Sequence, residues 1–295
     1  MRAGLLALSL AVGVQLFAQD DPFASIRPLH ASLATCSGQD CLTISTTLAE
    51  ALEQGLSADG AFEAWPTSTD FMASVQSSDG RVRVFTWNWP HPDRTSGYGG
   101  LVIDQNDDGE LRFTRLLDPS SADRPSDQQN YSPDQWPGAL YYAMVPDAVD
   151  KNTYLLLGWD DADAQVTRKI IEPLQLRSRG LRFGAPVLKT PLGMARRHVL
   201  EYADAVQASL RHQPATKGRN GQTESILFDH LAPREPHLTG ITAYYGPDMT
   251  FDAFVPGKKG KAPWVLMPNV DAIQALPQDR PFNDPRPRNR RRNRR

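Results

Sequence analysis

The acidic and imidazole side chains of the last third of the chain could support acid–base chemistry. Asp229 and His230 are adjacent in the segment FDHL, and Glu201, Asp248 and Asp252 lie on neighbouring predicted elements. A carboxylate and an imidazole can move protons for a substrate when a third group converges on them. Adjacent strand residues point to opposite faces of a sheet, so Asp229 and His230 are poorly placed to act together. The five residues are weak catalytic candidates, and a structural or surface histidine is favoured.

The segment DQNDDG at 104–109 has the composition of a calcium-binding loop. Asp104, Asn106 and Asp108 could direct oxygens at one Ca²⁺, and Gly109 permits the tight bend. An EF-hand would place its bidentate glutamate where this chain has Arg115, so a full EF-hand is excluded. An exposed acidic hairpin turn is the favoured interpretation, and no cofactor is expected apart from this weak calcium hypothesis.

Two tryptophans of the segment FTWNWP could form a ligand-binding surface. Trp87 and Trp89 are two residues apart and therefore lie on the same face of a predicted strand. Exposed aromatic rings in such a row bind sugars or peptides. Large aromatic side chains more often fill a β core, so core packing is favoured over a binding face.

The only two cysteines, Cys36 and Cys41, have four residues between them in CSGQDC. In an oxidising compartment such a pair can close a small loop as a disulfide. A metal site would need two further ligands, and no histidine or cysteine lies near; a redox motif would normally be C-x-x-C. The pair is predicted to be a local disulfide.

The last nineteen residues, from 277 to 295, are strongly basic. They carry eight arginines against two aspartates, whereas residues 19–276 carry 23 Lys and Arg against 32 Asp and Glu. Proline and clustered like charge leave little apolar surface to bury, so this tail is predicted to be disordered. Its arginines could hold phosphates of an anionic surface or an acidic partner, with nucleic acid an improbable target. The polyanion-binding candidates are Arg288, Arg290, Arg291, Arg292, Arg294 and Arg295.

The first eighteen residues predict export. Arg2 precedes an apolar stretch from Leu5 to Phe17, and Ala18 is the small residue after which a signal peptidase would cleave. Thirteen residues at about 1.5 Å each cover roughly 20 Å, short of a hydrocarbon core of roughly 30 Å. A signal peptide at 1–18 is therefore favoured over a membrane anchor. We expect a location in the periplasm, the outer envelope or the extracellular space, with no membrane span.

Beyond this leader the pattern predicts a mainly β protein. An irregular leader is expected at 19–41, followed by one mainly β domain at 42–276 with a single N-terminal helix at about 43–56. Short β-rich runs separated by Asp and Gly turns predict an antiparallel meander that forms a small propeller-like, sandwich or barrel-like body. Strands are expected at 71–76, 81–88, 98–104, 110–117, 140–145, 153–159, 166–176, 181–188, 197–203, 206–212, 225–230, 240–245, 251–255 and 263–267.

Several segments between 68 and 268 are shared, in order, with a known group of sequences. They are SSDGRVRVFTWNW, WPGALYY, YLLLGWDDADAQVTRKIIEPL, FGAPVL, RHVLEYA, ILFDHLAP, PDMTFDAF and PWVLM. The chain resembles a family of uncharacterised exported proteins from Bacteroidota-type bacteria. The resemblance implies export and one coherent domain, and it carries no activity or catalytic residue.

The sequence therefore favours a non-catalytic binding or scaffold protein of the cell envelope, tethered by its basic tail to an envelope protein or an anionic surface. No G-x-S-x-G, H-E-x-x-H or glycine-rich phosphate motif is present. The alternative is a secreted hydrolase that acts on glycan or peptide and uses some of the five catalytic candidates. The oligomeric state is left open.

Overall fold

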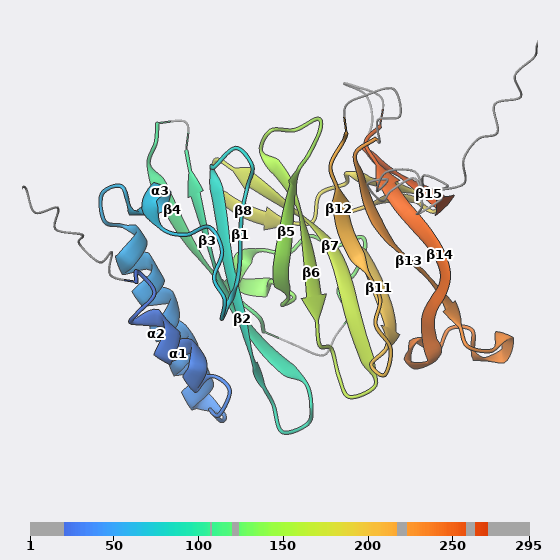
Figure 1. Ribbon diagram of the computed structural model, residues 1–295, viewed down its shortest axis with the longest axis horizontal. Coiled ribbons are helices and arrows are strands. Elements are labelled where there is room, and N and C mark those ends of the chain that lie inside the picture. Colours follow the sequence, from blue (N-terminus) through green and yellow to red (C-terminus); the bar gives the residue numbers. More distant parts are fainter. Residues whose placement is uncertain (1–20, 107, 120–123, 217–222, 258–262, 271–295) are drawn as a thin grey trace, which may run out of the picture.

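Four layers follow one another through the molecule: a layer of helices and three sheets, here named A, B and C (Figure 1). The computed structural model describes residues 21–106, 108–119, 124–216, 223–257 and 263–270. The expected mainly β class is confirmed. The sheets stack as in a sandwich and do not close into a barrel.

The helical layer and sheet A come first in the chain. The layer consists of α1 (Ile26–Ser32), α2 (Gln39–Leu56) and α3 (Ala61–Ala64). Sheet A is a simple antiparallel meander in the order β1-β2-β3-β4, as predicted for this part of the sequence. Its strands are β1 (Ala73–Gln76), β2 (Val82–Pro90), β3 (Ser96–Gln105) and β4 (Leu111–Leu117).

The chain moves between sheets B and C more than once: β9 and β10 join sheet C, β11 returns to sheet B, and the later strands complete sheet C. Sheet B has the order β11-β7-β6-β5, with β8 also paired to β7. Its strands are β5 (Leu140–Pro146), β6 (Thr153–Asp160), β7 (Val166–Arg177), β8 (Gly180–Phe183) and β11 (His198–Ala203). Sheet C has the order β10-β9-β15-β14-β13-β12, in which β15 and β9 are parallel. Its strands are β9 (Leu188–Thr190), β10 (Gly193–Ala195), β12 (Leu210–Gln213), β13 (Ser225–Pro233), β14 (Tyr245–Val255) and β15 (Trp264–Val270).

Three hydrophobic clusters hold the four layers together. The first joins the helices to one face of sheet A, the second joins the other face of sheet A to sheet B, and the third joins sheet B to sheet C. Alternate residues of a strand point to opposite faces, so Leu155 packs toward sheet C while Leu156 packs toward sheet A. Sheets A and B are therefore covered on both faces, which explains why β2, β3, β6 and β7 are buried along most of their length.

Helix α2 packs on sheet A through one mainly apolar face. Its buried residues, Cys41, Ser45, Leu48, Ala49, Leu52 and Leu56, recur at helical spacing. Beneath it, Gly97 and Gly99 of β3 leave room for the indoles of β2. A Cβ atom at Gly99 would lie 2.4 Å from Trp87 Nε1, and one at Gly97 would lie 2.4 Å from Trp89 Nε1. The two glycines therefore let both rings lie flat on the sheet.

Two sets of buried ion pairs lie between sheets A and B. Glu172 and Arg197 form a two-pronged pair, with Arg197 Nε 2.8 Å and Nη2 3.0 Å from the carboxylate oxygens, and both side chains are fully buried. Arg197 Nη1 also donates to the backbone carbonyls of Ser126 and Gln129, which fastens the segment before β5 to the core. Burial raises the pKa of Glu172, and Arg197 opposes this effect.

The second set joins β6, β7 and β11. Arg168 donates to Asp160 at 3.1 Å and to Glu201 at 3.0 Å, and the hydroxyl of Tyr98 donates to Asp160 at 3.1 Å. Burial raises the pKa of Asp160, while its hydrogen bonds and Arg168 favour the charged form. Every charge in this set has a close partner, as buried charges require.

The structure corrects three local expectations. The leader at 19–41 is not irregular throughout, because Phe23, Ile26 and Leu33 pack on α2 and fold the segment into α1. The predicted strand 181–188 ends at Phe183, since Gly184 adopts a φ of 88° and the chain then crosses to sheet C. The predicted strand 240–245 is mainly the 3₁₀ helix η3 (Thr242–Tyr244). Two further 3₁₀ turns are η1 (Pro133–Gln135) and η2 (Pro236–Leu238).

Other expectations concern residues that the structure does not describe. The predicted signal peptide at 1–18, the tail at 277–295 and its six candidate arginines lie outside the described residues. Among the helices of the described ranges, none is long and apolar enough to cross a membrane.

Candidate functional site

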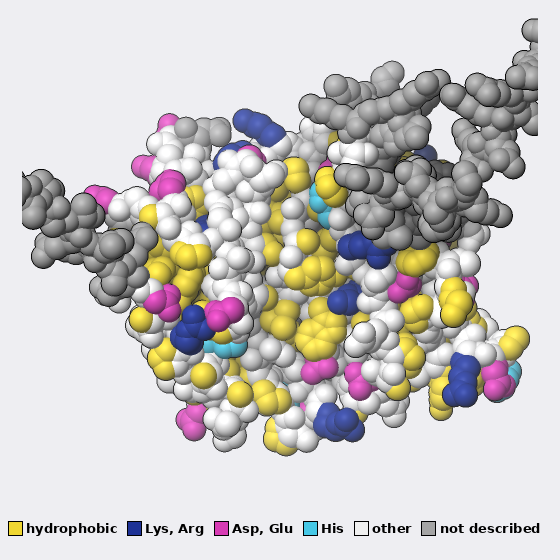
Figure 2. Space-filling model, viewed as in Figure 1, with side chains coloured by type: hydrophobic (Ala, Val, Ile, Leu, Met, Phe, Trp, Pro, Cys, Tyr) yellow, Lys and Arg dark blue, Asp and Glu magenta, His cyan; other side chains and the backbone are white. Residues whose placement is uncertain are grey.

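A cleft of about 510 Å³ opens between sheets A and B, at the ends of β2, β4 and β7. Its volume falls within the range of roughly 300 to 1,000 Å³ that is usual for small-molecule sites. The lining consists of three arginines, two carboxylates, four uncharged polar residues and two leucines: Arg81, Arg112, Arg177, Asp104, Glu110, Gln105, Asn106, Asn152, Ser178, Leu111 and Leu176. Figure 2 shows Lys and Arg side chains at the top edge of the molecule, near the end of β1 and β2.

Arg112 joins the two walls of the cleft. Its Nε and Nη2 donate to the two oxygens of Asp104 at 3.0 and 2.8 Å, and its Nη1 donates to the backbone carbonyl of Arg177 at 3.1 Å. The Asp104 side chain is 3% exposed. Sheet A is thereby tied to the end of β7 by one guanidinium whose three nitrogens are all engaged.

The other two arginines reach the cleft from the ends of strands. Arg81 precedes β2, and its Nη1 lies 3.4 Å from Asn152 Oδ1 of the turn before β6. Arg177 ends β7, and its Nε donates to Gln175 Oε1 at 2.8 Å. Sequence patterns did not predict this cleft because Arg81, Arg112 and Arg177 lie far apart in the sequence. The sequence indicated only that each of these arginines lies near one end of a β-rich run.

The predicted calcium residues lie at the rim of this cleft but do not form a metal site there. Both oxygens of Asp104 are bound by Arg112, and Asn106 Oδ1 accepts the backbone N–H groups of Asp108 and Glu110 at 3.0 and 2.8 Å. Asp108 is exposed. Within the described ranges, no group of three His, Cys, Asp or Glu residues could hold a metal ion. Calcium binding therefore stays a prediction without support from this geometry.

The five catalytic candidates divide among three places. Asp229 Oδ2 accepts the backbone N–H of Ser209 at 2.7 Å, and Glu201 belongs to the buried pairs with Arg168. His230 and Asp252 do meet: His230 Nδ1 lies 2.8 Å from Asp252 Oδ2. Asp229 and His230, which the sequence places poorly for acting together, have different hydrogen-bond partners.

The His230–Asp252 pair is produced by irregular pairing in sheet C. The register of β13 and β14 shifts between Asp229 and Leu231, and that of β14 and β15 shifts between Phe251 and Ala253. Bulges of this kind redirect side chains and are frequent beside functional sites. Sequence patterns do not reveal them, because a bulge breaks the period of two on which strand prediction depends.

The environment of His230 favours its charged form. The hydrogen bond to Asp252 raises the pKa of His230, and the nearby carboxylate of Asp248 acts in the same direction. Asp252 also accepts the backbone N–H of Asn269 at 3.0 Å, which fixes its orientation. Asp248 Oδ1 accepts from the backbone and the hydroxyl of Thr250.

An imidazole oriented by a carboxylate can serve as a general base. Across the described residues, however, Asp252 is the single hydrogen-bond partner of the His230 ring, and no serine, threonine or cysteine side chain is bound to it. The cleft lies elsewhere, between sheets A and B. Among the described residues, the contact to Asp252 is thus the whole hydrogen-bond environment of the His230 ring.

The tryptophans proposed as a ligand surface are core residues. Trp87 and Trp89 are 1% and 5% exposed beneath the helical layer. Trp87 Nε1 donates to Ser45 of α2 at 2.8 Å, and Trp89 Nε1 lies 3.1 Å from His91 Nε2. A ring must be accessible to stack on a ligand, so the binding interpretation is wrong for this structure and the core interpretation holds.

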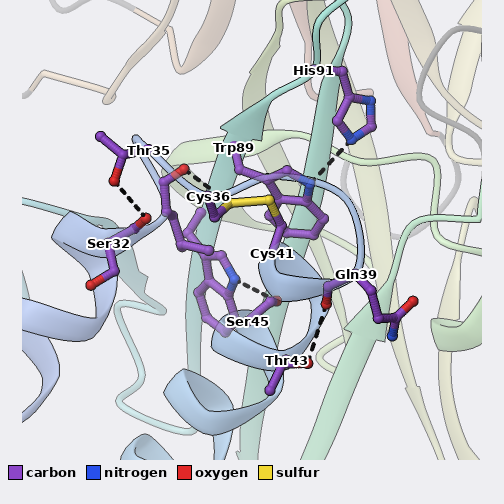
Figure 3. Close-up of a disulfide and its surroundings, with 11 residues drawn as sticks. Ser32, Thr35, Cys36, Gln39, Cys41, Thr43, Ser45, Trp89 and His91 are labelled. Atoms are coloured by element: carbon purple, nitrogen blue, oxygen red, sulfur yellow. Dashed lines mark hydrogen bonds between the residues drawn. A yellow bond between two sulfur atoms is a disulfide. The ribbon is translucent and has the colours of Figure 1, made fainter.

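The predicted disulfide is present between Cys36 and Cys41, with a Cα–Cα distance of 5.2 Å. It connects the end of the α1 segment to the first turn of α2 and lies beside Trp89 (Figure 3). The bond therefore fixes the two helices at the edge where they cover sheet A.

A second hollow, of about 450 Å³, lies between β1 and β5. It is lined by Thr67, Ser74, Val75, Gln76, Ser77, Tyr142, Ala143 and Met144. Figure 2 shows hydrophobic side chains gathered in the middle of this face, over β5. The described residues of its lining are all uncharged, so this hollow has fewer groups that could select a ligand than the arginine-lined cleft.

Comparisons with known proteins give no match: no protein-family model, no curated protein and no solved structure is similar to this chain. The function must therefore be argued from the molecule itself.

Proposed function

We propose that this protein is exported to the cell envelope and acts there as a non-catalytic binding protein, with the cleft between sheets A and B as its ligand site. The observation that carries this proposal is the cleft itself, because it combines a ligand-sized volume with convergent polar and charged groups. Arg112 braces the two walls, so the site is held by the fold.

Export rests on the leader sequence, and tethering rests on the basic tail. A tail with a net charge of about +6 is attracted to anionic lipid or to an acidic partner, and the attraction weakens with salt. In this proposal the tail holds the protein at a surface while the cleft takes the ligand.

The ligand site is tested by thermal-shift screening of the mature chain, residues 19–295, against sugars, peptides and small anions. Ser178→Trp places a bulky side chain in the cleft, and Thr43→Trp places the same side chain on the exposed face of α2 as a control. We expect a compound that stabilises the wild type and Thr43→Trp but not Ser178→Trp. Compounds that stabilise all three equally, or no stabilising compound at all, would argue against the cleft.

The tail is tested with lipid vesicles. The mature chain and a version ending at Asp284 are sedimented with phosphatidylcholine vesicles that contain or lack phosphatidylglycerol. We expect only the full chain to sediment with the anionic vesicles, and salt to release it. Equal sedimentation of both versions with the anionic vesicles would show that the tail does not tether the protein.

The alternative, a secreted hydrolase, is favoured by one observation, the His230–Asp252 pair at 2.8 Å. If the protein is a hydrolase, it should release sugars from a glycan or new amino groups from a peptide. The His230→Asn variant should lose this activity. Activity that survives this substitution would place any hydrolytic site elsewhere.

A further inference from the structure

The hollow between β1 and β5 follows the edges of two strands. Its lining includes the consecutive residues 74–77, from β1 and the position after it, and 142–144 of β5. Successive side chains of a strand point to opposite faces, so a hollow that is lined by consecutive residues lies along the edge of the strand. β1 ends sheet A and β5 ends sheet B, and the two strands are neighbours in Figure 1. The hollow is therefore bounded by two sheet edges.

The backbone of β1 turns hydrogen-bonding groups toward this hollow. The Ser77 N–H donates to the Val82 carbonyl at 2.8 Å, and the pairing with β2 continues in the same register through Val75. In an antiparallel pair, residues that exchange hydrogen bonds alternate with residues whose N–H and C=O point away from the partner strand. In β1 the outward residues are Ser74 and Gln76, and both line the hollow. Within the described ranges β1 pairs with β2 alone, so these outward groups have no strand to bond to.

The edge of β1 carries none of the usual devices that keep other strands away. Proteins protect sheet edges with charged side chains, prolines or bulges. β1 has the sequence ASVQ, its register with β2 is unbroken, and the described lining residues of the hollow are all uncharged. In β5, by contrast, the register shifts between Tyr141 and Ala143, and such a bulge bends the strand. Of the two edges, β1 is therefore the one that can accept a further strand.

The two sides of the hollow differ in polarity. Val75 packs in the cluster that joins sheets A and B, so Ser74 points to the opposite face, where its hydroxyl donates to the Thr67 carbonyl at 3.0 Å. On the side of sheet B the lining is formed by residues 142–144, and Tyr142 is 42% exposed. A strand added to β1 would direct alternate side chains to an apolar side and to a small polar side.

We infer that this hollow receives an extended segment of a partner protein, which adds to β1 as a further strand of sheet A. The segment is uncharged and alternates apolar with small polar residues. Main-chain hydrogen bonds to Ser74 and Gln76 supply affinity, and the unlike sides of the hollow supply specificity. This site is separate from the arginine-lined cleft, so the inference goes beyond the proposed function and does not rest on it.

The probes are arrayed six-residue peptides in which Ser or Thr alternates with Ala, Val, Leu or Phe, beside peptides of the same composition in block order. We expect the fluorescently labelled mature chain, residues 19–295, to bind alternating peptides at least about tenfold more tightly, because only these place their apolar side chains on one side. The best binder is then made in two versions, each N-methylated at every second residue. Alternate N–H groups of a strand point to the same side, so only the version methylated on the side toward β1 should lose binding.

Two variants locate the binding, and each has a control. Gln76→Pro removes an outward N–H from β1, at an edge where proline is tolerated, and should weaken the best peptide about tenfold or more. Leu117→Pro makes the same substitution in β4, at the opposite edge of sheet A, and should leave the affinity unchanged. Thr67→Trp narrows the hollow and should weaken binding, whereas Ser178→Trp, in the arginine-lined cleft, should not. Circular dichroism confirms that each variant is folded.

Failure of every alternating peptide to bind better than its block-order counterpart would overturn the inference. Equal effects of the two methylation patterns would also overturn it, as would binding that both Gln76→Pro and Thr67→Trp leave intact. If sedimentation velocity shows a dimer of the mature chain that Gln76→Pro dissociates, the occupant is a second copy of this chain and the external partner is wrong. Peptide binding that only Ser178→Trp abolishes would assign the peptides to the arginine-lined cleft and refute the site at β1.

Discussion

The pair of Glu172 and Arg197 should control the pH dependence of stability. Arg197→Met leaves a fully buried carboxyl group with no positive partner, and breaking such a pair costs about 3 to 5 kcal/mol. Burial raises the pKa of Glu172 even in the wild type, so in the variant the carboxyl should take up a proton on folding.

The magnitude follows from linkage. A carboxyl group whose pKa is raised on folding loses stability as the pH increases above its unfolded value, which is near 4.5. The slope is about 1.4 kcal/mol per pH unit, so about 3.4 kcal/mol is lost by pH 7 if the proton is still held there. Because Arg197 opposes the rise of the Glu172 pKa in the wild type alone, the variant should lose more stability than the wild type over this range, and its deficit should be larger at pH 7 than at pH 5.

The assay is urea unfolding followed by tryptophan fluorescence at pH 5, 6 and 7. The matched control is the double variant Glu172→Gln/Arg197→Met, which removes both charges. It should lose the pH dependence and keep only the smaller cost of the hydrogen bonds that Arg197 makes to backbone carbonyls. A single variant within about 1 kcal/mol of the wild type at pH 7, or a deficit that does not change with pH, would refute the reasoning.

Three further outcomes are expected. Replacing both cysteines with serine should lower the free energy of unfolding by about 2 kcal/mol, because the disulfide closes a short loop. Denaturant curves with and without reductant measure this, and a wild type that reductant leaves as stable as before would contradict it. Gly99→Ala should cost about 1 to 3 kcal/mol, since its Cβ would lie 2.4 Å from the neighbouring indole nitrogen, whereas Gly246→Ala, with no atom nearer than 3.5 Å, should cost less. The raised pKa of His230 stabilises the fold fully below about pH 6.5, and this contribution disappears as the pH rises through the folded value; melting curves should lose that part of the pH dependence in Asp252→Asn.

Much of the fold could be predicted from the sequence. In most strands, apolar and polar residues alternate or the residues are uniformly apolar, and turn residues mark both ends. The predicted runs 153–159 and 166–176 became β6 and β7 with ends shifted by at most one residue. The helix α1 was missed because it is only seven residues long and carries Pro28 in its first turn. The β9–β10 hairpin was missed because three-residue strands leave no period to recognise.

The candidate site was harder to predict, for a different reason. The arginine cleft depends on which sheets lie face to face, and no local pattern encodes that. Arg112 was part of a predicted strand, but its role follows from the partner Asp104 across the hairpin and from the end of β7. Among the catalytic candidates, the sequence included both members of the His230–Asp252 pair, although only the bulges of sheet C determine that they meet.

The strand order of sheet C determines which part of the fold can form last. The layers follow the chain closely, so a polypeptide that emerges N-terminus first can complete the helices and sheet A before sheet C exists. Strand β9, however, pairs with β10 and with β15, which is the last described strand. Until β15 is inserted between β14 and β9, Leu188 and its neighbours in the third cluster lack Trp264. This late, long-range closure should limit the folding rate, and a chain shortened before β15 should expose an apolar sheet to aggregation.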